Sequence, residues 1–399
     1  MQLWFHNENT YPFVPQNVLD EAESVRGSLP SRLCDPTIAA DLFHQCMDES
    51  LLCDDLGINI VSIEHHAGIN SLYGASPIVL GALARQTRNV RILSQGTLIT
   101  IRKDPVRVAE EYATADVLLR GRLDIGFVKS GDSEMASGNA NPVGNLERFW
   151  EAIDLITKAL KNQDGPVSWE GKHFTHRHIN LWPRPYQQPH PPMWAATGDP
   201  DTSRELGRRG MVNSVVLRGI DGTKRAWTAY REAVAEAGMP PPALDRFAYC
   251  GFVYVGDTDE EGVSVGSKLL WFLNTSLKQA PQFSKFLPGR MPPEAAPGAW
   301  RTKPRPGEAP IGRPADALRN MTADQAIQRQ IMFAGRPETV VKQIMAAYDV
   351  LGGFGHLIFI GRSGYLTHAE AEKSLKLLAK EVLPRLREEA KAKSLAPVS

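Results

Sequence analysis

The chain has 399 residues, of which 42% are hydrophobic and 23% charged, and its 45 basic residues balance its 45 acidic residues. This composition is typical of a soluble globular protein and gives no reason to expect nucleic acid or an anionic membrane surface as a partner. The N-terminus lacks the basic and apolar regions of a secretory signal, and no apolar run approaches the roughly 20 residues that a membrane span needs. We therefore expect a cytoplasmic protein.

Short apolar strands alternate with capped helices along most of the chain. Asp35-Pro36, Ser76-Pro77 and Asp104-Pro105 each place a capping residue and a proline where a helix is expected to begin. The alternation repeats every roughly 30 to 40 residues, which is typical of βαβ units with a parallel sheet. The expected strands cover residues 2–5, 58–63, 90–99, 122–128, 193–196, 211–217, 248–255 and 356–360. The expected helices cover residues 36–56, 76–87, 105–120, 145–160, 200–209, 221–237, 260–277, 335–351 and 368–387.

Eight strands separated by helices predict a closed (β/α)8 TIM barrel that forms one domain of residues 1–399. A doubly wound open sheet with extra elements is the alternative. A Pro/Gly-rich insertion after the seventh strand, at approximately residues 280–330, interrupts the alternation. We interpret it as a possible lid over the barrel mouth, against the alternative of a solvated loop. The four cysteines have no zinc-type spacing, so we expect buried thiols and no metal site.

The second expected strand ends in Glu64-His65-His66, an acid followed by two histidines. In a parallel α/β fold, side chains at the carboxyl ends of strands leave the core and meet the ligand. Because imidazole titrates near neutral pH and can transfer a proton, His65 is the candidate catalytic residue, and Glu64 is expected to orient or anchor. His66 is a candidate for substrate contact. The alternative is a pair of satisfied polar residues at a strand end.

Four segments in order resemble the flavin-dependent monooxygenases of the bacterial luciferase-like family. They are Glu64-His65-His66, residues 105–111 (PVRVAEE) in the helix after the third strand, residues 121–126 (GRLDIG) entering the fourth, and residues 180–185 (NLWPRP) before the fifth. The resemblance covers roughly residues 1–260, and residues 335–340 are also similar. Each segment alone is a weak signal, but their order and their positions on the expected barrel agree with the family.

The resemblance implies a barrel that binds flavin at the carboxyl ends of its strands, usually as a homodimer. Most members take reduced FMN from a separate flavin reductase, form a flavin hydroperoxide with O2 and oxygenate a small organic substrate. FAD or a deazaflavin is a less favoured cofactor. Two alternatives remain: a deazaflavin-dependent oxidoreductase, which would need a site for a long anionic tail, and a non-catalytic flavin-binding protein. No GxGxxG opens a βα unit, which agrees with a flavin that arrives already reduced.

The resemblance also places the flavin phosphate in the turn between the fifth strand and the next helix. Backbone N–H groups at Gly198 and Asp199, with the hydroxyls of Thr202 and Ser203, are the candidate ligands. A plain helix cap by Asp199 or Thr202 is the alternative. Because Asp199 adds negative charge there, a cation should compensate, and Lys129 at the end of the fourth strand is the candidate.

Gly96 and Thr97 are candidates for contact with the flavin ring, because a glycine inside a strand often marks the close approach of a ligand. A simple bulge is the alternative. Relatives often have a cis peptide bond near this position. Phe5, Tyr11 and Asn139 join His66 as candidates for substrate contact, although aromatic residues after the first strand are as often packing residues.

Overall fold

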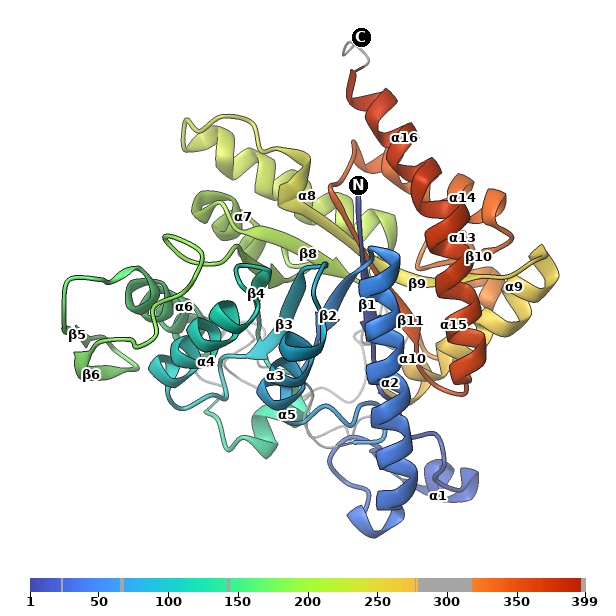
Figure 1. Cartoon of the computed structure of the whole chain (residues 1–399), viewed down its shortest axis with the longest axis horizontal. Helices are drawn as coiled ribbons and strands as arrows, with labels where there is room; N and C mark the ends of the chain where they lie inside the picture. The colour runs from blue at the N-terminus through green and yellow to red at the C-terminus, as the bar shows by residue number, and fades with distance from the viewer. Residues whose placement is uncertain (23, 65–67, 142–143, 277, 279–317, 396–399) are drawn as a thin grey trace, which may run out of the picture.

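A computed structural model of the chain describes residues 1–22, 24–64, 68–141, 144–276, 278 and 318–395. Within them, eight parallel strands close into a barrel surrounded by helices, which confirms the predicted (β/α)8 fold (Figure 1). Closure follows from the pairing of β11 with both β1 and β9, and of β9 with β8. In order around the barrel, the strands are β1 (Gln2–Asn7), β2 (Asn59–Ser62), β3 (Ile92–Leu98), β4 (Leu123–Val128), β7 (Met193–Ala196), β8 (Val212–Val216), β9 (Phe247–Val255) and β11 (His356–Arg362).

The barrel helices agree with the predicted alternation, and proline stands at the start of five of them. Asp35, Asp104 and Asp199 each cap a helix through a carboxylate that accepts backbone hydrogen bonds, as the sequence predicts for the first two. The helices of the barrel layer are α2 (Pro36–Leu56), α3 (Ser76–Gln86), α4 (Pro105–Leu118), α6 (Asn145–Lys161), α7 (Pro200–Arg209), α8 (Gly219–Glu236), α14 (Pro337–Leu351), α15 (His368–Leu377) and α16 (Leu383–Leu395).

Alternation along each strand divides the core into an inner and an outer part. In β1, Leu3 and Phe5 belong to the cluster that packs against the helices, whereas Trp4 belongs to the cluster inside the barrel. The Trp4 ring lies 5.2 Å from the Trp194 ring, and its indole N–H donates to His356 Nδ1 at 3.1 Å. These large side chains fill the amino-terminal part of the barrel, so a ligand has access from the carboxyl end.

The observed fold contains elements that were not predicted. A hairpin, β5 (Val167–Glu170) and β6 (Thr175–Ile179), follows α6 and lies at the edge of the molecule in Figure 1. An extra strand, β10 (Met332–Gly335), pairs with the carboxyl half of β9. The expected helix 260–277 divides into α9 (Asp259–Gly266), a 3-10 turn (Ser267–Leu270) and α10 (Trp271–Ser276).

The carboxyl ends of the strands carry additional short helices. These are α1 (Gln16–Glu21) after β1 and α5 (Asp132–Ser137) after β4, which lie at the lower end of the barrel in Figure 1, and α13 (Ala323–Gln328) before β10. Residues 279–317 of the predicted insertion lie outside the described residues, as do His65 and His66. The four cysteines form no disulfide. Among the helices in the described ranges, none combines the length and the apolar character needed to cross a membrane.

Candidate functional site at the carboxyl end of the barrel

Three of the predicted site residues lie at one end of the barrel. Glu64 and Lys129 follow the carboxyl ends of β2 and β4, and Gly96 lies in the carboxyl half of β3. This is the end at which ligands bind in barrels of this type. The structure thus has these residues at the carboxyl-end face, as the sequence predicts, although their individual contacts differ from several of the expectations.

Glu64 is held by a cation that the sequence reading missed. Its side chain is only 2% exposed, and its carboxylate lies 3.3 Å from Arg102 in the loop after β3. Arg102 also lies 3.8 Å from Glu111 on α4. A buried carboxylate that is paired in this way is fixed in position, which agrees with an anchoring role.

Lys129, Asp199 and Thr202 come together at the turn between β7 and α7. The Lys129 ammonium donates to Thr202 Oγ1 at 2.8 Å and lies 4.0 Å from the Asp199 carboxylate. That carboxylate caps α7, because it accepts the Thr202 N–H at 2.9 Å and the Thr202 hydroxyl. Burial alone would raise the pKa of the Asp199 carboxyl, but the Thr202 hydrogen bonds and the charge of Lys129 lower it below its usual value. The start of α7 therefore already holds an anion.

Ser203 does not contribute as expected, whereas Gly198 has a cation beside it. The buried Ser203 hydroxyl donates to the Asp199 carbonyl at 2.9 Å and accepts from Asn213 Nδ2 at 2.8 Å. These internal bonds leave the hydroxyl poorly placed for the predicted phosphate contact. Gly198 lies beneath Arg218: a Cβ at this position would come within 2.9 Å of Arg218 Cγ and 3.2 Å of Arg218 Nε. Arg218, which no motif marks in the sequence, thus adds a second cation to the turn.

Gly96 packs tightly against its neighbouring strand. The peptide bond between Gln95 and Gly96 is cis, in the region where relatives were expected to have one. A Cβ at Gly96 would lie 2.2 Å from Val128 Cγ1, closer than atoms can approach. Packing against Val128 is therefore sufficient to require glycine at this position, whether or not a ligand also approaches it.

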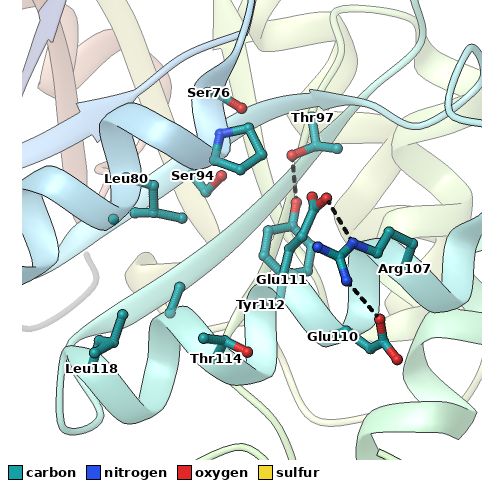
Figure 2. Close-up of a pocket in the computed structure, with 13 residues that line it drawn as sticks. Ser76, Leu80, Ser94, Thr97, Arg107, Glu110, Glu111, Tyr112, Thr114 and Leu118 are labelled. Atoms are coloured by element: carbon teal, nitrogen blue, oxygen red, sulfur yellow. Dashed lines mark hydrogen bonds and ion pairs between the residues drawn. The ribbon is translucent and has the colours of Figure 1, made fainter.

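The Thr97 side chain points away from the barrel interior. Its hydroxyl accepts a hydrogen bond from Tyr112 of α4 at 2.6 Å, as Figure 2 shows. Thr97 also lines a cavity of about 200 Å³ between α3 and α4, which includes Leu80, Arg107 and Glu111. Since this cavity lies in the helical layer behind β3, the Thr97 side chain does not fit the predicted contact with a flavin ring.

Gln95, one residue before Gly96, is a better candidate than Thr97 for contact with a flavin ring. It is buried, and its amide nitrogen donates to Ser214 Oγ of β8, across the barrel. Its amide oxygen has no hydrogen-bond partner among the described residues. A buried acceptor without a partner costs roughly 1–3 kcal/mol, so a ligand that donates a hydrogen bond there would be stabilised.

Other buried polar atoms without a hydrogen-bond partner in the described structure also come from segments at the carboxyl end. They are Asn9 Nδ2 after β1, Asn70 Oδ1 after β2 and Ser133 Oγ on α5. His6, at the end of β1, is buried and its Nε2 lies 3.0 Å from Glu8 Oε1. Because Trp4 faces the barrel interior, alternation directs His6 inward as well. This end of the barrel thus presents polar groups suited to a polar ligand.

The predicted substrate residues divide into three cases. Phe5 has no exposed surface and packs 5.7 Å from the Phe359 ring in the outer core, so it does not fit a substrate contact. Asn139 is exposed with φ +47°, a backbone conformation that asparagine tolerates at the end of a helix such as α5. Tyr11 lines an apolar cavity of about 230 Å³, together with Val25 and residues of the loop after β1, and remains a candidate.

Comparisons with known proteins agree with this geometry. Residues 31–353 match the family model described as luciferase-like monooxygenase. The chain is 24% identical over 383 residues to 3,6-diketocamphane 1,6-monooxygenase from Pseudomonas putida, covering 87% of this chain and 94% of that protein. It is also 24% identical over 359 residues to an F420-dependent glucose-6-phosphate dehydrogenase from Rhodococcus erythropolis, covering 86% and 94% of the two chains.

A third relative matches over a shorter stretch. It is the oxygenase component of a flavin-dependent trigonelline monooxygenase from Acinetobacter baylyi, which is 28% identical over 177 residues; the alignment covers 43% of this chain and about half (48%) of that protein. Among solved structures, the oxygenating constituent of 3,6-diketocamphane monooxygenase from Pseudomonas putida, in complex with FMN, has a TM-score of 0.68 at 21% identity. That comparison covers 91% of this chain and 96% of the other, and it supports the barrel fold.

Proposed function

The chain belongs to the luciferase-like monooxygenase family, and we propose that it is the oxygenase component of a two-component flavin-dependent monooxygenase. In this proposal it takes reduced FMN from a separate flavin reductase and uses O2 to oxygenate a small organic substrate. Relatives named as an oxygenase component and an oxygenating constituent support the two-component arrangement. We also expect a homodimer that works in the cytoplasm.

The main support for a flavin phosphate comes from the cations at the β7–α7 turn. Lys129 contacts the turn at Thr202, and Arg218 lies over Gly198. Since Asp199 already accepts the N–H and the hydroxyl of Thr202, a phosphate there would meet a like charge. We therefore expect the phosphate to bind on the Gly198 side of the turn, where Arg218 offers a guanidinium that suits phosphate oxygens.

The flavin ring would lie in the barrel mouth beside β3. A ring site needs a largely apolar slot with a few placed polar groups, and the Gln95 amide oxygen is an acceptor suited to a ring N–H. Bound reduced flavin would supply the electrons with which O2 is activated. The chain's own part in this step is to orient the ring and to keep water away from it.

Two features support the exclusion of water and the handling of protons. Two contacts hold the segment after β1 at the carboxyl end of the barrel. They are the buried ion pair between Arg26 and Glu134 and a hydrogen bond from the Val25 N–H to the Lys278 carbonyl, at 3.1 Å. His65, which lies outside the described residues, remains our candidate for proton transfer next to the anchored Glu64.

One observation favours a second candidate function, a deazaflavin-dependent oxidoreductase. A relative of similar identity is named as F420-dependent, and the cations beside Gly198 would also suit a cofactor with a longer anionic tail. Oxygen chemistry separates the two functions, because only the monooxygenase proposal requires the reduced cofactor to react productively with O2.

The test is to measure binding and oxidation of reduced FMN. Under anaerobic conditions, reduced FMN should bind more tightly than oxidised FMN in a calorimetric titration. On mixing with O2, bound reduced FMN should oxidise with a time course distinct from that of free reduced FMN. Aldehyde or ketone probes should then gain one oxygen atom by mass spectrometry. If reduced FMN does not bind, or oxidises as it does free in solution, the monooxygenase proposal fails.

A further inference from the structure

An apolar cavity lies between the loop after β1 and the loop after β2, at the carboxyl end of the barrel. Its volume is about 230 Å³, and most of its wall is aliphatic: Val14, Val25, Leu29, Leu33, Ile69 and Leu72. Among the described residues that line it, none has a charged side chain. Since an apolar cavity of about 150 Å³ accommodates benzene, this one has room for a molecule of about nine non-hydrogen atoms.

Backbone hydrogen bonds hold the two loops that form this cavity against each other. The Tyr11 N–H donates to the Ile69 carbonyl at 2.7 Å, and the Leu72 N–H donates to the Asn9 carbonyl at 3.0 Å. These contacts fix the walls without the help of a ligand. The cavity is therefore preformed, and a molecule that enters it loses little binding free energy to the ordering of loops.

One wall of the cavity also crosses the mouth of the barrel. Val25 lines the cavity, and its N–H donates to the carbonyl of Lys278, in the chain that follows β9. The next residue, Arg26, forms a β-bridge with Gly68 after β2 and an ion pair with Glu134 on α5, after β4. Because β2, β4 and β9 are not neighbours but are spaced around the barrel, the segment at Val25 and Arg26 reaches across its carboxyl end.

The opposite wall belongs to the loop that carries the candidate acid–base residue. Gly68, Ile69 and Leu72 line the cavity, and Gly68 is only four residues after the anchored Glu64. Four residues span at most about 14 Å, so the wall at Gly68 lies no farther than this from the end of β2. The cavity thus adjoins the region in which we expect oxygen transfer.

We propose that this cavity binds the hydrophobic body of the substrate and selects uncharged molecules of about nine non-hydrogen atoms. Burial of such a body is favourable in proportion to the apolar area that it removes from water. A carboxylate, sulfonate or ammonium group would lose its hydration without gaining a charged partner in the lining, so the cavity disfavours ionic substrates. The inference rests on the proposed function, because it assumes that the chain oxygenates a small organic molecule.

Cys34 provides a direct measure of whether the cavity is occupied. It lines the cavity and is half-buried, whereas the other three cysteines are buried. Burial and the charge of Asp35 raise the pKa of the Cys34 thiol, so its alkylation by iodoacetamide is followed at pH 8.5, where more of the thiolate is present. Mass spectrometry of the peptide that contains Cys34 gives the rate of alkylation on the full chain.

The probes differ in charge but not in the kind of apolar body. Acetophenone, cyclooctanone and octanal are neutral and have nine non-hydrogen atoms each, and 4-acetylbenzoate and octanoate are charged counterparts. At ten times its dissociation constant, measured by calorimetry, a neutral probe should slow the alkylation of Cys34 about tenfold. The charged probes at the same concentrations should slow it by less than about twofold.

Variants that fill the cavity test whether the bound molecule is the substrate. Leu29→Trp and Leu72→Phe each add bulk from a half-buried position in the wall. They should weaken binding of the neutral probes about tenfold and raise the KM for their oxygenation by a similar factor, while kcat and the affinity for reduced FMN change by no more than about twofold. The matched control, Val350→Trp, adds an indole at an exposed position in the last turn of α14. Thermal melting shows whether each variant folds.

The outcomes separate this inference from the proposed function. If no neutral probe protects Cys34, or if charged probes protect it equally, the inference is wrong, and the monooxygenase proposal stands as long as bound reduced FMN reacts productively with O2. If the filled variants lose protection but oxygenate neutral probes with the wild-type KM, the cavity does not bind the substrate and the inference is again wrong. If neutral probes protect Cys34 and the filled variants abolish this, but no probe gains oxygen, the selective apolar site is confirmed and the monooxygenase proposal fails.

Discussion

Arg26 and Glu134 form an ion pair with 3.0 Å between Nη2 and Oε1, although their side chains are only 10% and 4% exposed. Arg26 belongs to the segment between β1 and α2, and Glu134 belongs to α5 after β4. The pair therefore joins two loops at the carboxyl end of the barrel, where we expect the flavin to bind. A buried pair of this kind costs desolvation energy but fixes the geometry of the groups it joins.

Removing one partner of this pair should loosen the segment after β1. Arg26→Met leaves the Glu134 carboxylate buried without its guanidinium, which should lower the free energy of unfolding by about 3 kcal/mol. If the loss is local, it should appear as faster proteolysis within residues 8–35. Arg26→Met combined with Glu134→Leu removes both charges and should recover most of the loss. Equal damage in the single and double variants would show that charge burial is not the cause.

Gly96 should tolerate no side chain while Val128 is present. Gly96→Ala would place Cβ 2.2 Å from Val128 Cγ1, so the strands must shift, and we expect a loss of about 1–3 kcal/mol in the free energy of unfolding. Val128→Ala in the Gly96→Ala background should recover part of this loss, because it removes the two closest atoms. Urea denaturation of Gly96→Ala, Val128→Ala and the double variant gives a double-mutant cycle in the free energy of unfolding. If the losses of the two single variants add up to that of the double variant, the steric explanation is wrong.

His356 should make the protein less stable in mild acid. Burial lowers the pKa of His356 to about 4, and the neutral ring accepts from the Trp4 indole and contacts the Asp245 carbonyl at 3.0 Å. Between about pH 6.5 and 4 the unfolded chain binds a proton at this residue that the folded chain does not. The contribution of His356 to the free energy of unfolding is therefore fully present above pH 6.5. It is lost as the pH falls, by on the order of 3 kcal/mol at pH 4. Urea midpoints of wild type and His356→Gln should converge as the pH decreases.

His368 should show the opposite pH dependence. Its hydrogen bond with the buried Glu49 carboxylate, 3.1 Å from Nδ1, raises the pKa of the His368 imidazole. A raised pKa means that its stabilising contribution is present below the unfolded pKa and is lost as the pH rises through the folded value. The stability difference between wild type and His368→Gln should thus be larger at pH 5.5 than at pH 8.5. A constant difference across this range would assign His368 a packing role.

The barrel itself could be read from the sequence, but the direction of individual side chains could not. Capped helices and apolar strands gave the order of the elements and placed Glu64, Gly96 and Lys129 at the correct end. Strand β3 is buried on both faces, so its residues lack the apolar–polar alternation that distinguishes inside from outside. Thr97 was predicted to contact the ring because it adjoins Gly96, and no alternation showed that its hydroxyl faces Tyr112 in the helical layer.

Residues that act through distant contacts had no local signal. Arg102 and Arg218 stand in loops without a motif, and their roles depend on Glu64 and Gly198, which are 38 and 20 positions away in the sequence. Strand β10 is only four residues long and ends at Gly335, where the sequence predicts the start of a helix, so it gave no separate strand signal. The Asp199 cap was weighed from the sequence, but only the structure shows that it occupies the Thr202 N–H and hydroxyl.

The chemical proposal depends most directly on His65. His65→Ala should lower oxygen transfer to aldehyde or ketone probes by roughly 10²-fold or more, the usual loss when an acid–base group is removed. Hydrogen peroxide release should rise, because reduced FMN still reacts with O2 but without productive proton transfer. The comparison variant is His6→Gln, since His6 lies at the same end of the barrel and contacts Glu8 at 3.0 Å. Thermal melting and FMN titration of both variants separate lost chemistry from lost folding or binding. If His65→Ala transfers oxygen at the wild-type rate while His6→Gln does not, the acid–base role belongs to His6 and His65 is structural.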